Sequence, residues 1–281
     1  MAIRTYKNII CNKIIIFNVY IIFTYIYIYM KVKFLKYKKI IFFLFLVLGC
    51  VLLIPRQLIN EHFDNKEKIG IVMWYDDNIK EYADMTAEIN TLYCKKYNID
   101  FITSYEKTYT DRKPHWERLP LLLKNLKKYD YLIWIDADAF FYKDAPNIID
   151  IINKYKHFDF IFSKDICPPL AAGSTCETIN TGIFIVKNTP YSLEFLKKWA
   201  YDKIIWNKRS SNEDQDSLIY MINNNILNIN NDNHHIVLDF NVLQSFDLIQ
   251  SSDKPYIMHM AGQNKKYRID TISKYLQSLI T

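Results

Sequence analysis

The stretch YLIWIDADAFFYKD, residues 131–144, places two carboxylates inside an apolar run. Asp136 and Asp138 stand one residue apart, between the apolar segments YLIWI and AFF. An ionised carboxylate is costly to bury without a partner, so we expect both side chains at the end of a strand, facing a positive group. Residues two apart on a strand share a face, which favours a divalent cation, Mn²⁺ or Mg²⁺, as that group.

Strand-like apolar runs alternate with helical patterns on both sides of this stretch. The predicted strands cover residues 68–77, 99–106, 130–136, 158–165, 181–188, 236–246 and 256–262. The predicted helices cover residues 77–97, 117–129, 147–155, 192–203, 213–225 and 271–280. This order predicts an α/β fold with a largely parallel central sheet. Ligands of such sheets bind beyond the carboxyl ends of the strands, which is where the two aspartates lie.

The composition is that of a folded protein whose positive charge is confined to one end. The chain has 281 residues, of which 50% are hydrophobic and 23% charged, and its net charge is +6. Residues 1–39 contain eight basic residues and no acidic one, so residues 40–281 carry a net charge of −2. The folded part therefore lacks the basic surface typical of nucleic-acid-binding proteins.

The N-terminal region is typical of a membrane anchor. Within residues 1–39, segment 14–30 is a possible extra apolar segment, and residues 40–54 form a second uncharged run that predicts a transmembrane signal anchor. The lysine-rich loop between them should stay in the cytosol. We expect a short stalk over 55–67 and the folded domain over 68–281. This is a single-pass type II arrangement with the domain on the non-cytosolic side, the Golgi or ER lumen in a eukaryotic host. A cleaved signal peptide is the alternative.

Two further features of the sequence leave alternatives open. A chain beginning at Met30 would have a short basic tail and one anchor, so residues 1–29 are a candidate upstream extension outside the functional protein. Cys167 and Cys176 flank the segment PPLAAGST and could form a disulfide in an oxidising compartment or remain two free thiols.

Several segments from about residue 69 to 268 carry a family resemblance. They are YCKKYNIDF (93–101), HWERLPLLLKNL (115–126), WIDADAFF (134–141), INTGIFIVKNTPYSLEFLKKWA (179–200), NEDQDSLIY (212–220) and HMAG (259–262). In this order they resemble the galactosyltransferase GMA12/MNN10 family, glycosyltransferase family 34. The resemblance implies a GT-A (Rossmann-like) nucleotide-sugar-binding domain.

The resemblance also implies an activity. A retaining, metal-dependent glycosyltransferase would move a hexose or pentose from UDP-galactose, UDP-xylose or GDP-mannose to a hydroxyl of a glycan or glycoconjugate. Asp136, Asp138 and His259 would hold the cation. Gln215 and Asp214 would act at the sugar that is transferred.

The remaining site residues implied by the resemblance fall into two groups. The donor and its phosphates would contact Arg118, Asp136, Gly262 and Lys265. The sugar and acceptor pocket would be lined by Asn180, Thr181, Gly182 and Glu213. Arg118 stands where the family usually has lysine; arginine can bind a phosphate bidentately, but with a different geometry.

Other interpretations of the same residues remain. A haloacid-dehalogenase-type phosphatase also places an aspartate after an apolar strand, and a membrane-anchored sugar-binding module without catalytic activity would keep the same pocket. Trp74 and Tyr75 could line a nucleobase pocket or belong to the core, whereas Trp116 is better interpreted as a core residue.

Overall fold

The computed structural model describes residues 19–24, 26, 67–165, 179–206, 213–231, 233–239, 241–246 and 256–280. The chain divides into two compact units, Met1–Lys66 and Glu67–Thr281. In the first, residues 19–24 and 26 are helical. Among the described residues, no helix combines the length and the apolar character needed to cross a membrane. Residues 40–54, where the anchor is expected, lie outside the described residues, as do Cys167 and Cys176.

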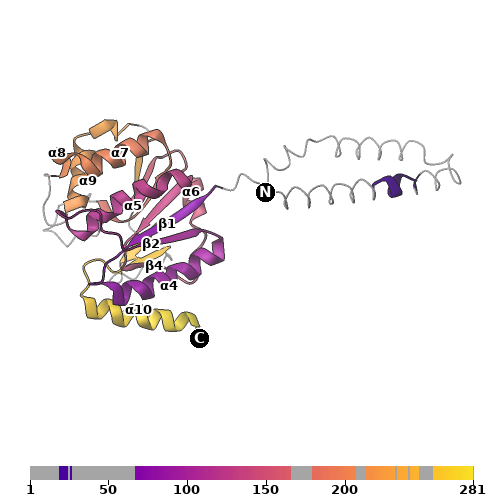
Figure 1. The fold of residues 1–281 in the computed structure, drawn as a ribbon, viewed down its shortest axis with the longest axis horizontal. Coiled ribbons are helices and arrows are strands. Elements are labelled where there is room, and N and C mark those ends of the chain that lie inside the picture. Colours follow the sequence, from indigo (N-terminus) through magenta and orange to yellow (C-terminus); the bar gives the residue numbers. More distant parts are fainter. Residues whose placement is uncertain are drawn as a thin grey trace. The chain divides into compact units, whose positions relative to one another are not determined.

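The second unit is built on a six-stranded sheet with the strand order β2-β1-β3-β6-β5-β7 (Figure 1). Its strands are β1 (Ile69–Trp74), β2 (Asp100–Ser104), β3 (Tyr131–Ile135), β5 (Phe160–Lys164), β6 (Ile179–Lys187) and β7 (His235–Leu238). Only β6 runs against its neighbours β3 and β5, while the other strands of this sheet are parallel to one another. The predicted α/β class with a mostly parallel sheet is confirmed.

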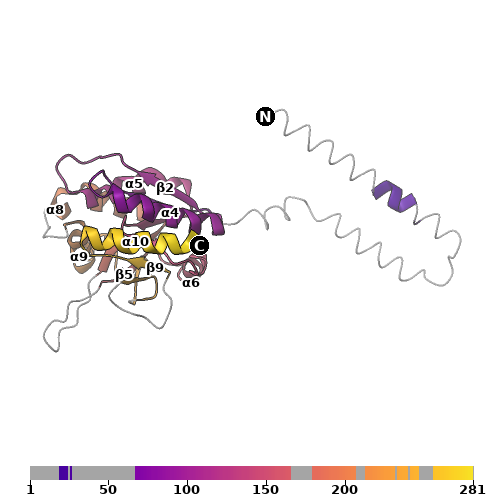
Figure 2. The same cartoon turned by 90° about the horizontal axis from the view of Figure 1, so that it is seen from below.

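Helices cover both faces of this sheet. They are α4 (Lys80–Tyr97), α5 (Arg118–Asn125), α6 (Ile149–Lys154), α7 (Pro190–Tyr201), α8 (Lys203–Trp206), α9 (Glu213–Asn223) and α10 (Lys265–Ile280), with 3-10 turns η1 (Pro114–Glu117), η2 (Leu126–Lys128) and η3 (Ile226–Asn228). In β1, Ile71 and Met73 pack with α4, α6 and α10, whereas Val72 and Trp74 pack with α5, α7 and α9. Figures 1 and 2 show α4 and α10 side by side. Burial on both faces explains why the strands are uninterrupted apolar runs.

A second, three-stranded sheet completes the unit. It consists of β4 (Ala139–Phe141), β9 (Ile257–His259) and β8 (Gln244–Phe246), in that order. Asn90 of α4 fastens β4, because its side chain donates to the carbonyl of Ala139 and accepts from the amide of Phe141. Ala139 is paired with His259 in the antiparallel β4–β9 ladder. The small sheet therefore brings His259 beside the aspartates that precede β4.

Three predictions about local structure were wrong. The strand predicted over residues 236–246 is two strands, β7 and β8, which belong to different sheets. Asp136 and Asp138 do not lie on a strand: β3 ends at Ile135, and the amide of Ala139 donates to the carbonyl of Asp136 at 3.0 Å, which closes a turn. The last helix begins at Lys265 and not at residue 271. Its first turn is therefore made of the basic residues that follow Gly262.

Candidate functional site

A cavity of about 660 Å³ opens at the edge of the large sheet where β3 and β5 end and β6 begins. Its lining residues come from segments far apart in the sequence: His115, Arg118, Asp136, Asp138, Asp165, Asn180, Thr181, Gly182, Asp214, Gln215, Phe246, His259, Ala261, Gly262 and Arg268. Most of the side chains predicted from the sequence are thus brought together in one cavity. The exceptions are Lys265, which does not line it, and Glu213, whose side chain lies outside the described residues.

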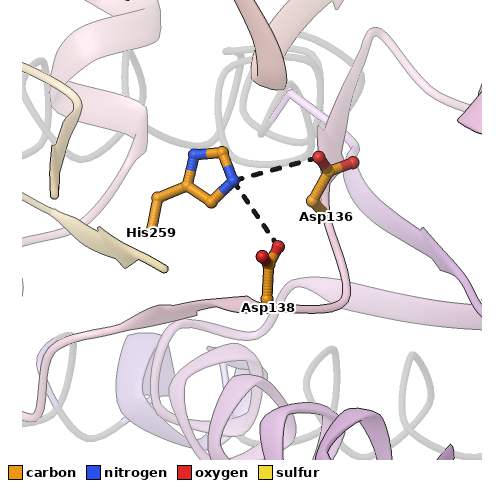
Figure 3. Close-up of side chains that lie close together, drawn as sticks. All are labelled: Asp136, Asp138 and His259. Carbon is orange, nitrogen blue, oxygen red and sulfur yellow. Dashed lines mark ion pairs between the residues drawn. The ribbon is translucent and has the colours of Figure 1, made fainter. Parts of the chain in front are cut away.

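Asp136, Asp138 and His259 form a cluster suited to a cation. Figure 3 shows the imidazole of His259 pointing between the two carboxylates, with Nε2 3.5 Å from Asp138 and 3.9 Å from Asp136. One possible ligand atom from each residue lies within 4.8 Å of the others. Two carboxylates and one imidazole are ligands that suit Mn²⁺ and related divalent ions. These residues therefore fit the divalent cation that the sequence predicts.

Three neighbours fix the orientation of His259. Its Nδ1 lies 3.0 Å from Oε1 of Gln244, an atom that can only accept, so Nδ1 carries the hydrogen and Nε2 faces the carboxylates. The ring of Phe246 stacks against the imidazole at a centroid distance of 5.4 Å. A Cβ atom on Gly182 would lie 2.2 Å from Cε1 of His259. Gly182, expected as a wall of the sugar pocket, therefore makes room for the imidazole.

The two aspartates have opposite electrostatic environments. For Asp138, burial disfavours the charged form, but the hydrogen bond and charge of His259, together with the charge of Arg268, outweigh it and lower its pKa. For Asp136, burial outweighs the attraction of Arg118, and its pKa is raised. The indole nitrogen of Trp134 also donates to Asp136 at 2.7 Å.

Arg118 joins two carboxylates that line the cavity. Its guanidinium lies 3.3 Å from Oδ1 of Asp136 and 3.2 Å from Oδ2 of Asp214, and it also donates to the carbonyls of His115 and Thr181. The side chain is only 5% exposed. Arg118, expected to contact phosphate, therefore forms ion pairs with the buried Asp214 and the partly exposed Asp136 in this structure.

Asp214 is a buried acid at the start of α9. Burial raises its pKa to about 7, against the opposing attraction of Arg118. Its other neighbours are polar: Thr181 Oγ1 at 3.4 Å and Nε2 of His115 at 3.7 Å, while the indole of Trp199 donates to its backbone carbonyl. Asp214 is therefore held at a fixed position on the cavity wall.

Asp165 is a site residue that the sequence did not reveal. It directly follows β5, and its carboxylate accepts from Nε2 of Gln215 at 3.0 Å and from Nδ2 of Asn180 at 3.2 Å. Gln215 in turn accepts from the amide of Thr181 at 3.1 Å. The only signal in the sequence was an acidic residue at the carboxyl end of a predicted strand. This network fixes the side chains of Gln215 and Asn180 at the cavity.

The remaining predicted residues have other surroundings. Lys265 lies 3.2 Å from the carbonyl of Asn78 and 3.4 Å from Glu81, on the side of α4. Gly262 lines the cavity with φ +74°, a conformation that favours glycine.

The three aromatic residues considered from the sequence belong to the core. Trp116 and Trp74 are buried in the cluster packed with α5, α7 and α9, and Tyr75 is buried in the cluster on the opposite face. The Tyr75 hydroxyl is bonded to Asp84 and Tyr105. None of the three lines the cavity.

Comparison with known proteins agrees with this arrangement. Residues 70–269 match the nucleotide-diphospho-sugar transferase family. "Probable glycosyltransferase 2" of Oryza sativa subsp. indica is 25% identical over 133 residues, 42% of this chain and 25% of its own length. "Xyloglucan 6-xylosyltransferase 4" of Arabidopsis thaliana is 24% identical over 131 residues, 44% of this chain and 25% of its own length. The chain thus matches about a quarter of the length of these relatives.

A solved structure shows the same fold. The crystal structure of a glycosyltransferase involved in the glycosylation of the major capsid of PBCV-1 has a TM-score of 0.59 to this chain at 17% identity. The match covers 74% of this chain and 99% of that one. The fold is therefore the GT-A glycosyltransferase fold, and the family match argues against the phosphatase alternative. The chain belongs to the nucleotide-diphospho-sugar transferase family, as a glycosyltransferase domain.

Proposed function

We propose that the chain transfers a hexose or pentose from a nucleoside-diphosphate sugar to a glycan hydroxyl, with retention of configuration and with the help of a divalent cation. The observation that carries this proposal is one cavity that is lined both by the Asp136–Asp138–His259 cluster and by Asp214 and Gln215. A cation site alone would suit many hydrolases. A cation site that shares its cavity with a fixed amide and a buried acid suits a sugar diphosphate that contacts both.

The roles of the residues follow from their contacts. A divalent cation bound by the cluster would offset the negative charge that develops on the departing diphosphate. In the same cavity Asp165 accepts a hydrogen bond from the amide of Gln215, and this negative and polar pair would stabilise the transferred sugar as it becomes cation-like. Asp214 is placed to accept hydrogen bonds from a sugar or acceptor hydroxyl, since Arg118 keeps its carboxylate in position.

We also propose a family, a set of donor sugars and a membrane arrangement for this enzyme. The motifs resemble the GMA12/MNN10 family, and the similarity to a xyloglucan 6-xylosyltransferase of Arabidopsis thaliana supports UDP-xylose among the candidate donors, beside UDP-galactose and GDP-mannose. An anchor over residues 40–54 with the glycosyltransferase domain on the non-cytosolic side would give this enzyme access to luminal glycans.

The test uses the full-length chain and a panel of UDP- and GDP-sugars. Binding and slow hydrolysis of each donor are recorded with Mn²⁺ and with EDTA, for the wild type and for Asp138→Asn. Asp150→Asn on exposed α6 serves as a control with the same chemical change. We expect one donor to bind only with the metal, and Asp138→Asn to lose that binding while the control keeps it.

Two outcomes would contradict the proposal. If no donor binds to the folded wild type, the glycosyltransferase activity is wrong for this chain. If a donor binds but is neither hydrolysed nor transferred to any acceptor glycan, the chain is a sugar-binding module without activity.

A further inference from the structure

Asp138 divides its two carboxylate oxygens between the cation cluster and an arginine. Oδ1 lies 3.5 Å from Nε2 of His259, whereas Oδ2 lies 2.7 Å from Nη2 of Arg268, in the first turn of α10. The Asp138 side chain is only 11% exposed, so this ion pair is little screened by water. Arg268 therefore supplies much of the positive charge that Asp138 needs when no cation is bound.

Arg268 is held far less firmly than Arg118. Its further contacts are a 3.2 Å bond from Nε to the carbonyl of Met260, a 3.4 Å contact from Nη1 to the hydroxyl of Tyr82 and a cation–π contact with the Tyr82 ring at 5.5 Å. Its side chain is 20% exposed, against 5% for Arg118. Because Arg268 also lines the cavity, its guanidinium can leave Asp138 and still remain inside the site.

A guanidinium and a divalent cation attract the same carboxylate and repel each other. The phosphates of a bound nucleotide offer the guanidinium a second anionic partner, with which arginine forms strong paired hydrogen bonds. We propose that Arg268 is an exchangeable counter-ion of Asp138. It weakens cation binding to the protein alone and moves onto the diphosphate when a nucleotide enters. Cation and nucleotide binding are thereby coupled. The diphosphate half of this inference rests on the proposed function.

The first experiment needs no nucleotide. Mn²⁺ alone is titrated into the full-length wild type and into the variants Arg268→Gln, Arg268→Lys and Lys274→Gln, the last being an exposed lysine further along the same helix. We expect Arg268→Gln to bind Mn²⁺ at least about tenfold more tightly than the wild type, because the competing charge is gone. Arg268→Lys keeps a positive charge at position 268, and Lys274→Gln leaves Arg268 itself beside Asp138. The Mn²⁺ affinity of both variants should therefore stay within about threefold of the wild-type value.

Thermal unfolding shows whether Arg268→Gln is folded and reports the same effect. Without a metal this variant leaves Asp138 short of positive charge, so its Tm should fall, and Mn²⁺ should raise that Tm by more than it raises the wild-type value. Unchanged or weaker Mn²⁺ affinity in folded Arg268→Gln would overturn the counter-ion role. Equal Mn²⁺-induced shifts in Tm would overturn it as well.

The coupling is measured by repeating the titrations with UDP and with GDP. We expect the nucleotide that binds, UDP or GDP, to increase the Mn²⁺ affinity of the wild type. In Arg268→Gln this increase should be at least about tenfold smaller. A nucleotide effect of the same size in both proteins would overturn the coupling. If neither nucleotide binds the wild type, the proposed donor class fails, whereas the titration with Mn²⁺ alone still decides the role of Arg268.

Discussion

Two arginines line the cavity, Arg118 and Arg268, and they differ in how many partners hold them. Arg118, at the start of α5, is 5% exposed and bridges two carboxylates, Asp136 in the turn after β3 and Asp214 of α9. Arg268, at the start of α10, is 20% exposed and has one carboxylate partner, Asp138. Arg118 has its carboxylate partners before any ligand binds. Arg268 can exchange its partner for a ligand.

This difference follows from how each arginine is surrounded. Arg118 sits between elements of the main sheet, and two carbonyls accept hydrogen bonds from it in addition to the two acids. Arg268 lies beside the short strands β4 and β9, where the chain turns at Gly262. A buried charge with fixed partners stabilises the geometry of a site, whereas a partly exposed charge can respond to charge that arrives with a ligand.

The largest effect is expected from removing the charge of Arg118. Arg118→Met leaves the buried Asp214 and the partly exposed Asp136 without their shared cation, and we expect a loss of about 3–5 kcal/mol in the free energy of unfolding. Urea unfolding at neutral pH measures it. Arg268→Gln should lose clearly less. Equal losses of unfolding free energy in the two variants would contradict the difference between the two arginines.

The pH dependence of stability tests the surroundings of Asp214, the buried acid beside Arg118. Burial raises the pKa of Asp214 from 3.8, the ordinary value of an aspartate, to about 7 in the folded chain. Between these values the folded state keeps a proton that the unfolded state releases, so this group makes stability fall as the pH rises from about 4 to about 7, and no further above that. The loss is at most about 4 kcal/mol.

Asp214→Asn should remove this part of the pH dependence. Urea unfolding of the variant and the wild type at pH values from 4 to 8 gives the two slopes, with Asp150→Asn as the exposed control. The Asp214→Asn curve should be flatter than the other two between pH 4 and 7. Identical slopes in all three proteins would show that Asp214 is not the buried acid described.

The two cavity glycines separate steric from conformational effects. In Gly182→Ala the new Cβ would meet His259 at 2.2 Å, so either the imidazole or β6 must move, at about 1–3 kcal/mol, and Mn²⁺ affinity should fall. In Gly262→Ala nothing lies within 4 Å of the new Cβ, and the cost of about 1–2 kcal/mol comes from φ +74°. Mn²⁺ titration with unfolding data for both variants tests this. Unchanged Mn²⁺ affinity in Gly182→Ala would be inconsistent with the packing described.

The smallest effect concerns the partner of His259. Gln244→Leu removes the acceptor that fixes Nδ1, and we expect about tenfold weaker Mn²⁺ binding with little change in stability. Gln244→Glu keeps an acceptor oxygen and should retain more of the affinity. If Leu and Glu at this position give the same affinity, Gln244 does not orient the imidazole.

The sequence predicted the main sheet and much of the site, because both depend on local patterns. The apolar run before Asp136 is buried on both faces, and the order of motifs placed His259 with the aspartates. The direction of β6 was not predictable, because an apolar run looks the same in a parallel and an antiparallel pairing. The strands of the small sheet have three residues each, too few for a periodic pattern.

The errors at the site have a common cause, which is long-range contact. The ion pairs of Arg118 with Asp136 and Asp214 were missed, because only the fold brings these residues together, whereas the predicted phosphate contact of Arg118 stays a prediction. Asp165 belongs to no motif and becomes a site residue only through Gln215. The convergence of Asp136 and Asp138 was predicted from strand alternation, whereas it arises from a turn and from the pairing of β4 with β9.

The most direct test of the account is pulsed electron paramagnetic resonance on Mn²⁺ bound to the full-length chain in the presence of UDP or GDP. We predict one bound Mn²⁺ per chain with a coupling to a histidine nitrogen, and loss of that coupling in His259→Gln. His157→Gln, at an exposed position, should leave the coupling intact. Bound Mn²⁺ without nitrogen coupling, or coupling that survives in His259→Gln, would contradict the cation site formed by Asp136, Asp138 and His259.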